Sequence, residues 1–185
     1  MLEDISYKSA SHVTFILGGA RSGKSAFAEE ICQKLAAAEN KQLIYIATAE
    51  AFDQEMQERI DLHIHRRGDH WQTINTPVDL ADQIRKLTSD QVALVDCLTI
   101  WLNNLIYHEK NIHHALDDLS QALKAAPCPV MLVSNEIGLG LVPMDKLSRR
   151  FRDHSGTMNQ QIAALASTVY FVAAGLPIKM KPTTL

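Results

Sequence analysis

One segment near the N-terminus constrains the fold of this chain more than any other, because it matches the pattern G-x-x-x-x-G-K-[ST] of a phosphate-binding loop. Its residues are Gly18, Gly19, Ala20, Arg21, Ser22, Gly23, Lys24 and Ser25. Residues 13–17 before it are apolar and rich in β-branched and aromatic types, which predicts a buried strand, and residues 26–35 after it have the pattern of a helix. In this order, backbone N–H groups and the helix N-terminus converge on a phosphate. We therefore predict a nucleotide site in which Lys24 reaches the β- and γ-phosphates and the Ser25 hydroxyl binds Mg²⁺.

The rest of the composition is compatible with an enzyme of one domain. The chain has 185 residues, of which 46% are hydrophobic and 21% are charged, so it can bury a substantial core. Its formal net charge of −3 argues against broad binding to nucleic acids or anionic membranes. We expect a single domain over residues 1–185, with residues 1–11 as an N-terminal extension to which we assign no role.

The cysteines and the apolar runs suggest a cellular compartment. Cys32, Cys97 and Cys128 are far apart and form no Cys-x-x-Cys pair, which is typical of a reducing environment and not of a disulfide framework or a zinc ribbon. No apolar run approaches the roughly 20 residues that span a bilayer, and the N-terminus lacks the apolar core of a signal peptide. We expect a cytoplasmic enzyme with no membrane span.

Apolar runs alternate with amphipathic stretches along the whole chain. Strands are predicted at residues 13–17, 42–47, 71–74, 91–96, 130–134 and 168–173. Helices are predicted at residues 26–35, 53–68, 78–87, 99–107, 112–124 and 145–166, and residues 179–185 are predicted to be a polar tail. The alternation predicts an α/β fold of the P-loop NTPase-like type, a mostly parallel sheet with helices on both faces. Ligands bind at the carboxyl ends of such strands, so residues 18–25, 48–50, 96–99 and 135–140 should share one edge.

Asp96 is the candidate for the second acidic residue of a P-loop enzyme. It follows the apolar residues 92–95 and would hold Mg²⁺ directly or through water. Aspartate is also favoured as a helix N-cap, and the position alone does not separate these two roles. Because the chain also contains the phosphate loop, we favour the metal role.

A cluster of basic residues occurs within the predicted helix 53–68. Arg59, His63, Arg66 and Arg67 lie at spacings that place the arginines on the side of the helix that carries His63, whereas His65 faces elsewhere. Guanidinium groups around an imidazole suit a polyphosphate and keep a ring nitrogen unprotonated, able to attack phosphorus. A solvated charged face is the alternative, and the spacing alone favours it.

Other polar residues leave two interpretations open. Arg149, Arg150 and Arg152 suit either phosphate binding across a subunit boundary or a solvated helical face. The loop after the strand at 130–134 suits either substrate contact or an ordinary turn. His12, His108 and His154 are isolated and carry little signal.

Several further stretches, in a fixed order, carry a resemblance to a known family. They are residues 45–49; Glu55, Met56, Arg59, Ile60 and His63; 66–68; 70–73; 96–99 with Trp101 and Asn104; 134–140 with Val142 and Pro143; 151–153 with Gly156, Asn159 and Gln160; and 175–179. Together with the phosphate loop, they make the chain resemble the bifunctional adenosylcobinamide kinase / adenosylcobinamide-phosphate guanylyltransferase of cobalamin biosynthesis, from about residue 14 to residue 181.

The resemblance implies two reactions at one nucleotide site. The first phosphorylates the hydroxyl of the aminopropanol arm of adenosylcobinamide, with ATP or GTP as donor. The second transfers GMP from GTP to that phosphate through a guanylylated histidine, which falls on His63, with His65 as the fallback. The residues implied to contact nucleotide, beyond the loop, are Thr48, Ala49, Glu50, Arg66, Arg67, Gly68, Asp69 and Asp96. The family also implies a homo-oligomer, a trimer.

One position departs from the family pattern. Members of the family commonly carry a glutamate at the place of Asn75, where it is thought to contact guanine. Asparagine has no charge and offers one acceptor oxygen, so it would hold the N–H groups of guanine less firmly. Guanine selectivity is therefore open. The alternatives to the bifunctional enzyme are a P-loop small-molecule kinase that lacks the transferase step and a nucleotide-dependent switch.

Overall fold

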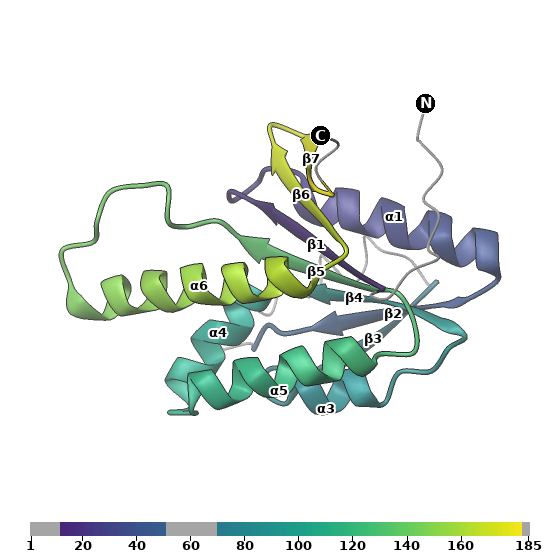
Figure 1. Ribbon diagram of the computed structural model, residues 1–185, viewed down its shortest axis with the longest axis horizontal. Coiled ribbons are helices and arrows are strands. Elements are labelled where there is room, and N and C mark those ends of the chain that lie inside the picture. Colours follow the sequence, from purple (N-terminus) through teal and green to yellow (C-terminus); the bar gives the residue numbers. More distant parts are fainter. Residues whose placement is uncertain (1–11, 51–69, 183–185) are drawn as a thin grey trace.

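A computed structural model of the chain describes residues 12–50 and 70–182. Within them, seven strands form one sheet in the order β3-β2-β4-β5-β1-β6-β7 (Figure 1). The strands are β1 Val13–Gly18, β2 Gln42–Ala47, β3 Trp71–Asn75, β4 Gln91–Asp96, β5 Val130–Asn135, β6 Thr168–Ala173 and β7 Leu176–Lys181. All neighbouring pairs are parallel except β6 and β7, which are antiparallel. The sheet is thus mostly parallel, as the alternation in the sequence predicts.

Helices cover both faces of the sheet. They are α1 Lys24–Glu39, α3 Leu80–Arg85, α4 Leu98–Tyr107, α5 Ile112–Ala125 and α6 Lys146–Leu165. Figure 1 shows α1 on one side of the sheet and α3, α4, α5 and α6 on the other. Two helices begin at capped residues, because the side chains of Asn111 and Asp145 accept hydrogen bonds from the backbone N–H groups of His114 and Ser148.

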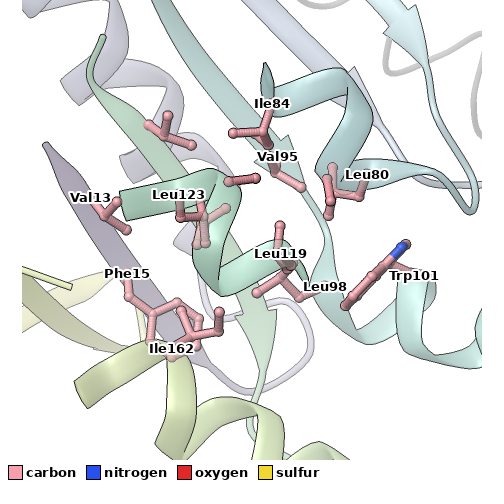
Figure 2. Close-up of a cluster of buried hydrophobic side chains, with 14 of the residues drawn as sticks. Val13, Phe15, Leu80, Ile84, Val95, Leu98, Trp101, Leu119, Leu123 and Ile162 are labelled. Atoms are coloured by element: carbon pink, nitrogen blue, oxygen red, sulfur yellow. The ribbon is translucent and has the colours of Figure 1, made fainter. Parts of the chain in front are cut away.

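The two faces bury separate apolar clusters. Successive residues of a strand point to opposite faces, so Phe15 packs on the side of α3 to α6 and Ile16 on the side of α1. The larger cluster includes Leu80, Leu98 and Leu119 (Figure 2). Because central strands are buried on both faces, β1 is buried along its whole length.

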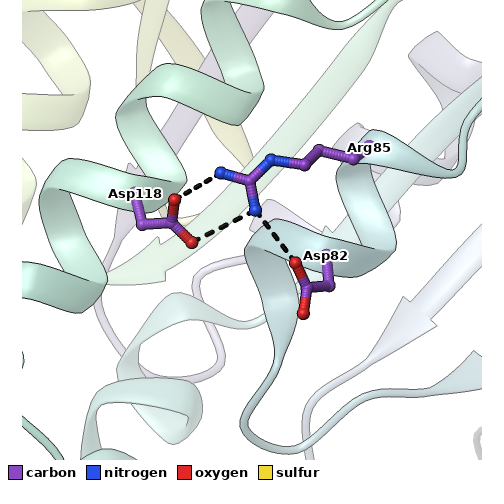
Figure 3. Close-up of polar contacts among 3 residues, drawn as sticks. All are labelled: Asp82, Arg85 and Asp118. Carbon is purple, nitrogen blue, oxygen red and sulfur yellow. Dashed lines mark hydrogen bonds and ion pairs between the residues drawn. The ribbon is translucent and has the colours of Figure 1, made fainter.

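An ion-paired arginine ties two helices of the larger layer together. Arg85 of α3 pairs with Asp118 of α5, through both terminal nitrogens, and with Asp82 of its own helix at 2.9 Å (Figure 3). The Arg85 guanidinium, chiefly through its hydrogen bonds, holds the pKa of Asp118 below its usual value. The pair is largely exposed and adds little stability, so α3 is held against α5 mainly by buried residues such as Ile84 and Leu119.

The strand register aligns the carboxyl ends of the parallel strands. Gly18 at the end of β1 pairs with Asn135 of β5, and Ala47 at the end of β2 pairs with Asp96 of β4 and Asn75 of β3. The prediction that the loops after these strands share one edge is therefore confirmed.

The C-terminal part of the chain differs from the sequence-based expectation. The prediction of a polar tail over residues 179–185 is wrong, because β7 extends to Lys181 and pairs with β6. The turn between these strands has positive φ at Ala174 and Gly175, as a tight hairpin turn requires. This strand lies at the sheet edge and leaves Leu176, Ile178 and Met180 more than half exposed, so it lacks the continuous apolar run by which the other strands were recognised.

Some expectations concern residues outside the described ranges. The helix predicted at residues 53–68 and the N-terminal extension 1–11 both lie there. Among residues 12–50 and 70–182, no helix has both the length and the apolar content required to cross a bilayer.

A truncation in the larger core tests this architecture. Leu119 is fully buried, so we expect Leu119→Ala to lower the free energy of unfolding by about 2–5 kcal/mol. Gln121→Ala, on the exposed side of the same helix, should change it by less than about 0.5 kcal/mol. Urea denaturation of both variants and the parent measures the difference, and equal stabilities would contradict the assigned core.

Candidate nucleotide site

The phosphate loop turns tightly between β1 and α1. Arg21 and Gly23 both have positive φ, of 56° and 94°, and Gly23 occupies the N-cap position of α1. Because glycine has no side chain, no side-chain cap occupies the first-turn N–H groups of α1, which are then available to an anion. A cavity of about 420 Å³ lies at this point, lined by residues 21–26 and Glu29. The loop thus has the shape and polarity of a phosphate cradle.

Lys24 lies over the loop. Its side chain is largely buried, and its Nζ donates a hydrogen bond to the carbonyl oxygen of Gly19 at 3.0 Å. This bond holds the ammonium group beside the turn, from which a four-carbon stem can carry it to a phosphate. Lys24 and Ser25 are the first two residues of α1, and both line the cavity.

The loop is supported from behind by the hairpin of β6 and β7. The N–H group of Gly175 donates to the carbonyl oxygen of Ser22 at 2.9 Å. A Cβ atom at Gly18 would lie 2.5 Å from the carbonyl oxygen of Val172 in β6, and one at Gly23 would lie 3.3 Å from the Cα atom of Gly175. Glycine is required at Gly18 by this close approach, and at Gly23 also by the backbone conformation.

The carboxylate of Asp96 lies at the end of β4 with a fixed orientation. The hydroxyl of Tyr45, on the adjacent strand, donates a hydrogen bond to its Oδ2 atom at 3.0 Å. The next residue, Cys97, is locked to Thr48: its N–H group donates to the Thr48 hydroxyl, which in turn donates to the Cys97 carbonyl oxygen, both at 2.9 Å. The residues that follow β2 and β4 are therefore held together by two hydrogen bonds.

Burial determines the protonation state of Cys97, the residue after Asp96. Burial, the largest cause, and the negative charge of Asp96 raise the pKa of the Cys97 thiol to about 11, while the positive charge of Lys24 acts in the opposite direction. Because the thiol stays protonated at neutral pH, Cys97 is a packing residue and not a nucleophile.

The oxygen atoms at this edge are of the type that Mg²⁺ prefers. Ser25 is the second residue of α1 and lines the cavity, and Asp96 is the last residue of β4, at the carboxyl edge of the sheet. Magnesium commonly takes one or two such protein oxygens and completes its shell with water and substrate phosphates. Within the described part of the chain, no cluster of three or more histidine, cysteine and acidic side chains has a metal-binding arrangement.

A buried network of hydroxyl and amide groups lies at the same edge, and the sequence does not indicate a role for it. The Thr99 hydroxyl lies 3.1 Å from that of Ser134 and accepts a hydrogen bond from the N–H group of Asn135. The Ser134 hydroxyl donates to Oδ1 of Asn159 on α6 at 2.9 Å. This network joins α4, β5 and α6 beneath the loop that follows β5. Its members belong to the stretches that carry the family resemblance, but nothing in the sequence indicates that they bond to one another.

The remaining predicted residues fall into two groups. Thr48 is fully buried, whereas Asn75, at the end of the neighbouring strand β3, is exposed. The Glu50 carboxylate pairs with His108 at 3.0 Å, a partner that the sequence did not suggest. The residues that lie outside the described ranges are Arg59, His63, His65, Arg66, Arg67, Gly68 and Asp69.

The arginines of α6 are engaged within the chain. Arg149 donates to the carbonyl oxygens of Pro143, at 3.1 Å, and Met144. Arg150 donates to His154 at 3.3 Å. Arg152 lies 3.7 Å from the carboxylate of Asp153. The bonds of Arg149 tie the loop before α6 to its first turn, whereas the contacts of Arg150 and Arg152 lie within the helix.

Comparison with known proteins identifies relatives over most of the chain. A family model described as cobinamide kinase / cobinamide phosphate guanyltransferase matches residues 14–180. The bifunctional adenosylcobalamin biosynthesis protein CobP of Pseudomonas aeruginosa is 44% identical over 169 residues, which cover 90% of this chain and 95% of that protein. The bifunctional adenosylcobalamin biosynthesis protein CobU is 35% identical in Escherichia coli and 37% identical in Salmonella typhimurium, each over 90% of this chain and 98% of the relative.

Solved structures of distant proteins share the fold. A KaiC-like protein of Pyrococcus horikoshii superposes with a TM-score of 0.51 at 12% identity, over 87% of this chain and 71% of that one. The flagellar accessory protein FlaH of Methanocaldococcus jannaschii gives a TM-score of 0.50 at 11% identity, over 88% of this chain and 70% of that one. At such identities the likeness concerns the fold alone, and it confirms the predicted P-loop NTPase-like architecture.

The close approach at Gly18 gives a direct test of the loop. We expect Gly18→Ala to weaken binding of a nucleoside triphosphate at least about tenfold and to lower the free energy of unfolding by about 1–3 kcal/mol, because the backbone oxygen of Val172 cannot move aside at little cost. Gly156→Ala is the control, since a Cβ atom there meets nothing within 4 Å and alanine favours the helix. Calorimetric titration and urea denaturation measure both quantities. Unchanged binding by Gly18→Ala would contradict the described packing.

Proposed function

This chain belongs to the cobinamide kinase / cobinamide phosphate guanyltransferase family, and from that premise we propose that its single nucleotide site serves two consecutive transfers. In the first, the hydroxyl of the aminopropanol arm of adenosylcobinamide takes the γ-phosphoryl group of ATP or GTP. In the second, the resulting phosphate takes GMP from GTP, which gives adenosylcobinamide-GDP and pyrophosphate. The observation that carries the proposal is the convergence of the phosphate cradle, Lys24 and Asp96 at one edge within the matched region.

In the kinase step, the chain positions the triphosphate and stabilises its charge. The N–H groups of the loop and of the first turn of α1 bind the β- and γ-phosphates. Lys24 exchanges its bond to Gly19 for a bond to these phosphates and neutralises the charge that develops as the γ-phosphoryl group is transferred. The acceptor hydroxyl oxygen then attacks the γ-phosphorus in line and loses its proton to solvent, and the nucleoside diphosphate leaves with the electron pair of the broken P–O bond.

In the guanylyl step, His63 is the proposed nucleophile. A ring nitrogen of His63 attacks the α-phosphorus of GTP, a nitrogen–phosphorus bond forms, and pyrophosphate leaves with the electron pair of the broken bond. An oxygen of adenosylcobinamide phosphate then attacks the same phosphorus and releases the histidine. Arg59, Arg66 and Arg67 are proposed to stabilise charge on the transferred group. The family resemblance supports these assignments.

The remaining roles at the site are also proposals. Thr48, Ala49, Glu50, Gly68, Asp69 and Asn75 are proposed to contact the nucleotide, together with loop residues 18–25. Mg²⁺ would be held by Ser25 and Asp96, whose hydroxyl and carboxylate oxygens suit it, and when bound it neutralises charge on the β- and γ-phosphates. Tyr45 keeps the Asp96 carboxylate oriented for this purpose.

The cellular setting and the assembly are proposed on other grounds. The described cysteines are all free and buried, which suits a reducing compartment, and we propose a cytoplasmic enzyme. The family resemblance supports a homo-oligomer, specifically a trimer. The large corrinoid is the proposed acceptor, and no nucleic acid is expected as a partner.

Covalent labelling separates the two steps. We expect incubation with α-labelled GTP to leave an acid-labile, base-stable label on the protein, because phosphorus bound to nitrogen hydrolyses in acid. His63→Ala should abolish the label and retain phosphorylation of adenosylcobinamide, whereas His65→Ala should keep both. A label that persists in His63→Ala would contradict the assignment, and loss of the label only in His65→Ala would transfer the role to His65.

Lys24→Ala tests the kinase step. We expect a loss of about a hundredfold or more in kcat/KM for phosphorylation, since the variant removes the cation that meets the transferring group. Lys34→Ala is the matched control, because Lys34 lies on the same helix in an exposed pair with Glu30. Phosphorylation of adenosylcobinamide by a wild-type chain that never becomes labelled would favour a simple P-loop kinase. Failure of the wild-type chain to use any phosphoryl acceptor would favour a nucleotide-dependent switch.

A further inference from the structure

Helix α4 holds the loops that follow two neighbouring strands. Trp101, Asn104 and His108 lie at spacings of three and four residues, so their side chains share one side of α4 and its C-cap. The indole N–H of Trp101 donates to the carbonyl oxygen of Val78 at 2.7 Å, and His108 pairs with the carboxylate of Glu50. Between them, Asn104 contacts both loops. The three side chains form a clamp on the ends of β2 and β3.

Asn104 is the central member of this clamp. Its side-chain amide nitrogen donates one hydrogen bond to the carbonyl oxygen of Thr48, at 2.7 Å, and another to that of Pro77, at 3.0 Å. Asn104 and Thr48 are both fully buried, so water is no ready substitute for the bond to Thr48, whereas Pro77 is only partly buried. An uncharged amide supplies two N–H donors in one plane, which is the arrangement that two converging carbonyl oxygens need.

The loop after β2 is also fixed from its other side. The Thr48 hydroxyl is bonded to the backbone of Cys97, and the Thr48 N–H group donates to the carbonyl oxygen of Asp96 at 3.3 Å. The loop after β3 has a different support, since Thr76 donates from its N–H group to the carbonyl oxygen of Ala47 at 2.7 Å. Asn104 is therefore the side chain that is bonded both to the loop that carries Glu50 and to the loop that begins at Thr76, directly after Asn75.

We infer that Asn104 is a positioning residue for the nucleoside end of the bound nucleotide. This inference rests on the proposed function, in which Thr48, Ala49, Glu50 and Asn75 contact the nucleotide. The phosphate end is supported separately, by Lys24 and by the hairpin of β6 and β7. Loosening the clamp should therefore weaken binding of the nucleotide more than it slows the chemical step.

Two variants and one matched control test the inference. Asn104→Ala removes both donors, and Trp101→Phe removes only the bond to Val78 while it keeps an aromatic ring in the core. Leu105→Ala, at the adjacent buried position of α4, is the control because it loosens the core without removing either bond. Equilibrium binding of GTP is measured by calorimetry, which needs no turnover, and phosphorylation of adenosylcobinamide is measured beside it.

We expect Asn104→Ala to raise the Kd for GTP at least about tenfold and Trp101→Phe to raise it about threefold, with kcat at saturating donor within about twofold of the parent. Leu105→Ala should lose at least as much thermal stability as Asn104→Ala while its Kd stays within about twofold. The same rise in Kd for Leu105→Ala, or an unchanged Kd for Asn104→Ala, would overturn the inference. If Asn104→Ala does not fold, an unchanged Kd for Trp101→Phe overturns it.

GTP binding and group transfer by the wild-type chain test the proposed function separately. A wild-type chain that binds GTP but transfers neither a phosphoryl nor a guanylyl group would contradict the proposed function, and the Kd values of the variants would still decide the role of Asn104. A wild-type chain that does not bind GTP would overturn both.

Discussion

The close packing of the phosphate loop against β6 is the constraint on which the candidate site depends. At Gly18 the backbone passes so near the carbonyl oxygen of Val172 that no side chain fits between them. This approach lets Gly175 bond to Ser22 and holds the turn in the shape that points the N–H groups of α1 into the cavity. The parallel register then brings the other strand ends to the same edge, since Gly18 is level with Asn135 and Ala47 with Asp96. The backbone register thus brings the loop, the Asp96 carboxylate and the polar network to one edge of the sheet, and side chains then fix their orientation.

The fold follows from the sequence because its signals are local and repeated. Each central strand is a short apolar run, as in the stretch that ends at Asp96, and buried parallel strands require such runs. The loop motif identifies the phosphate cradle for the same reason, since its function depends on residues that are adjacent in the chain. The edge strand β7 was not predicted, because it lacks such an apolar run. Half-exposed side chains and an antiparallel partner leave a pattern there that resembles a polar segment.

The supports of the site could not be predicted because they join residues that are distant in the chain. Nothing in the neighbourhood of Asn104 in the sequence indicates that its amide bridges the carbonyl oxygens of Thr48 and Pro77. The pairing of Thr99 with Ser134 and the pairing of His108 with Glu50 likewise arise only when the strands are placed side by side. The resemblance to a family supplied the stretch from Asp96 to Asn104 as a pattern, and the structure supplies a physical reason for it. Buried polar side chains there satisfy backbone groups that the sheet leaves unpaired at its carboxyl edge.

The hairpin that supports the phosphate loop also affects the order in which the site is built. Chains emerge from the ribosome N-terminus first, so β1 and the loop exist long before the residues of β6 and the turn at Gly175. Until those residues arrive, the loop lacks the bond to Ser22 and the wall formed by Val172. A nascent chain with the complete nucleotide-binding motif therefore lacks the finished cradle, and competence to bind nucleotide is a late event in its synthesis.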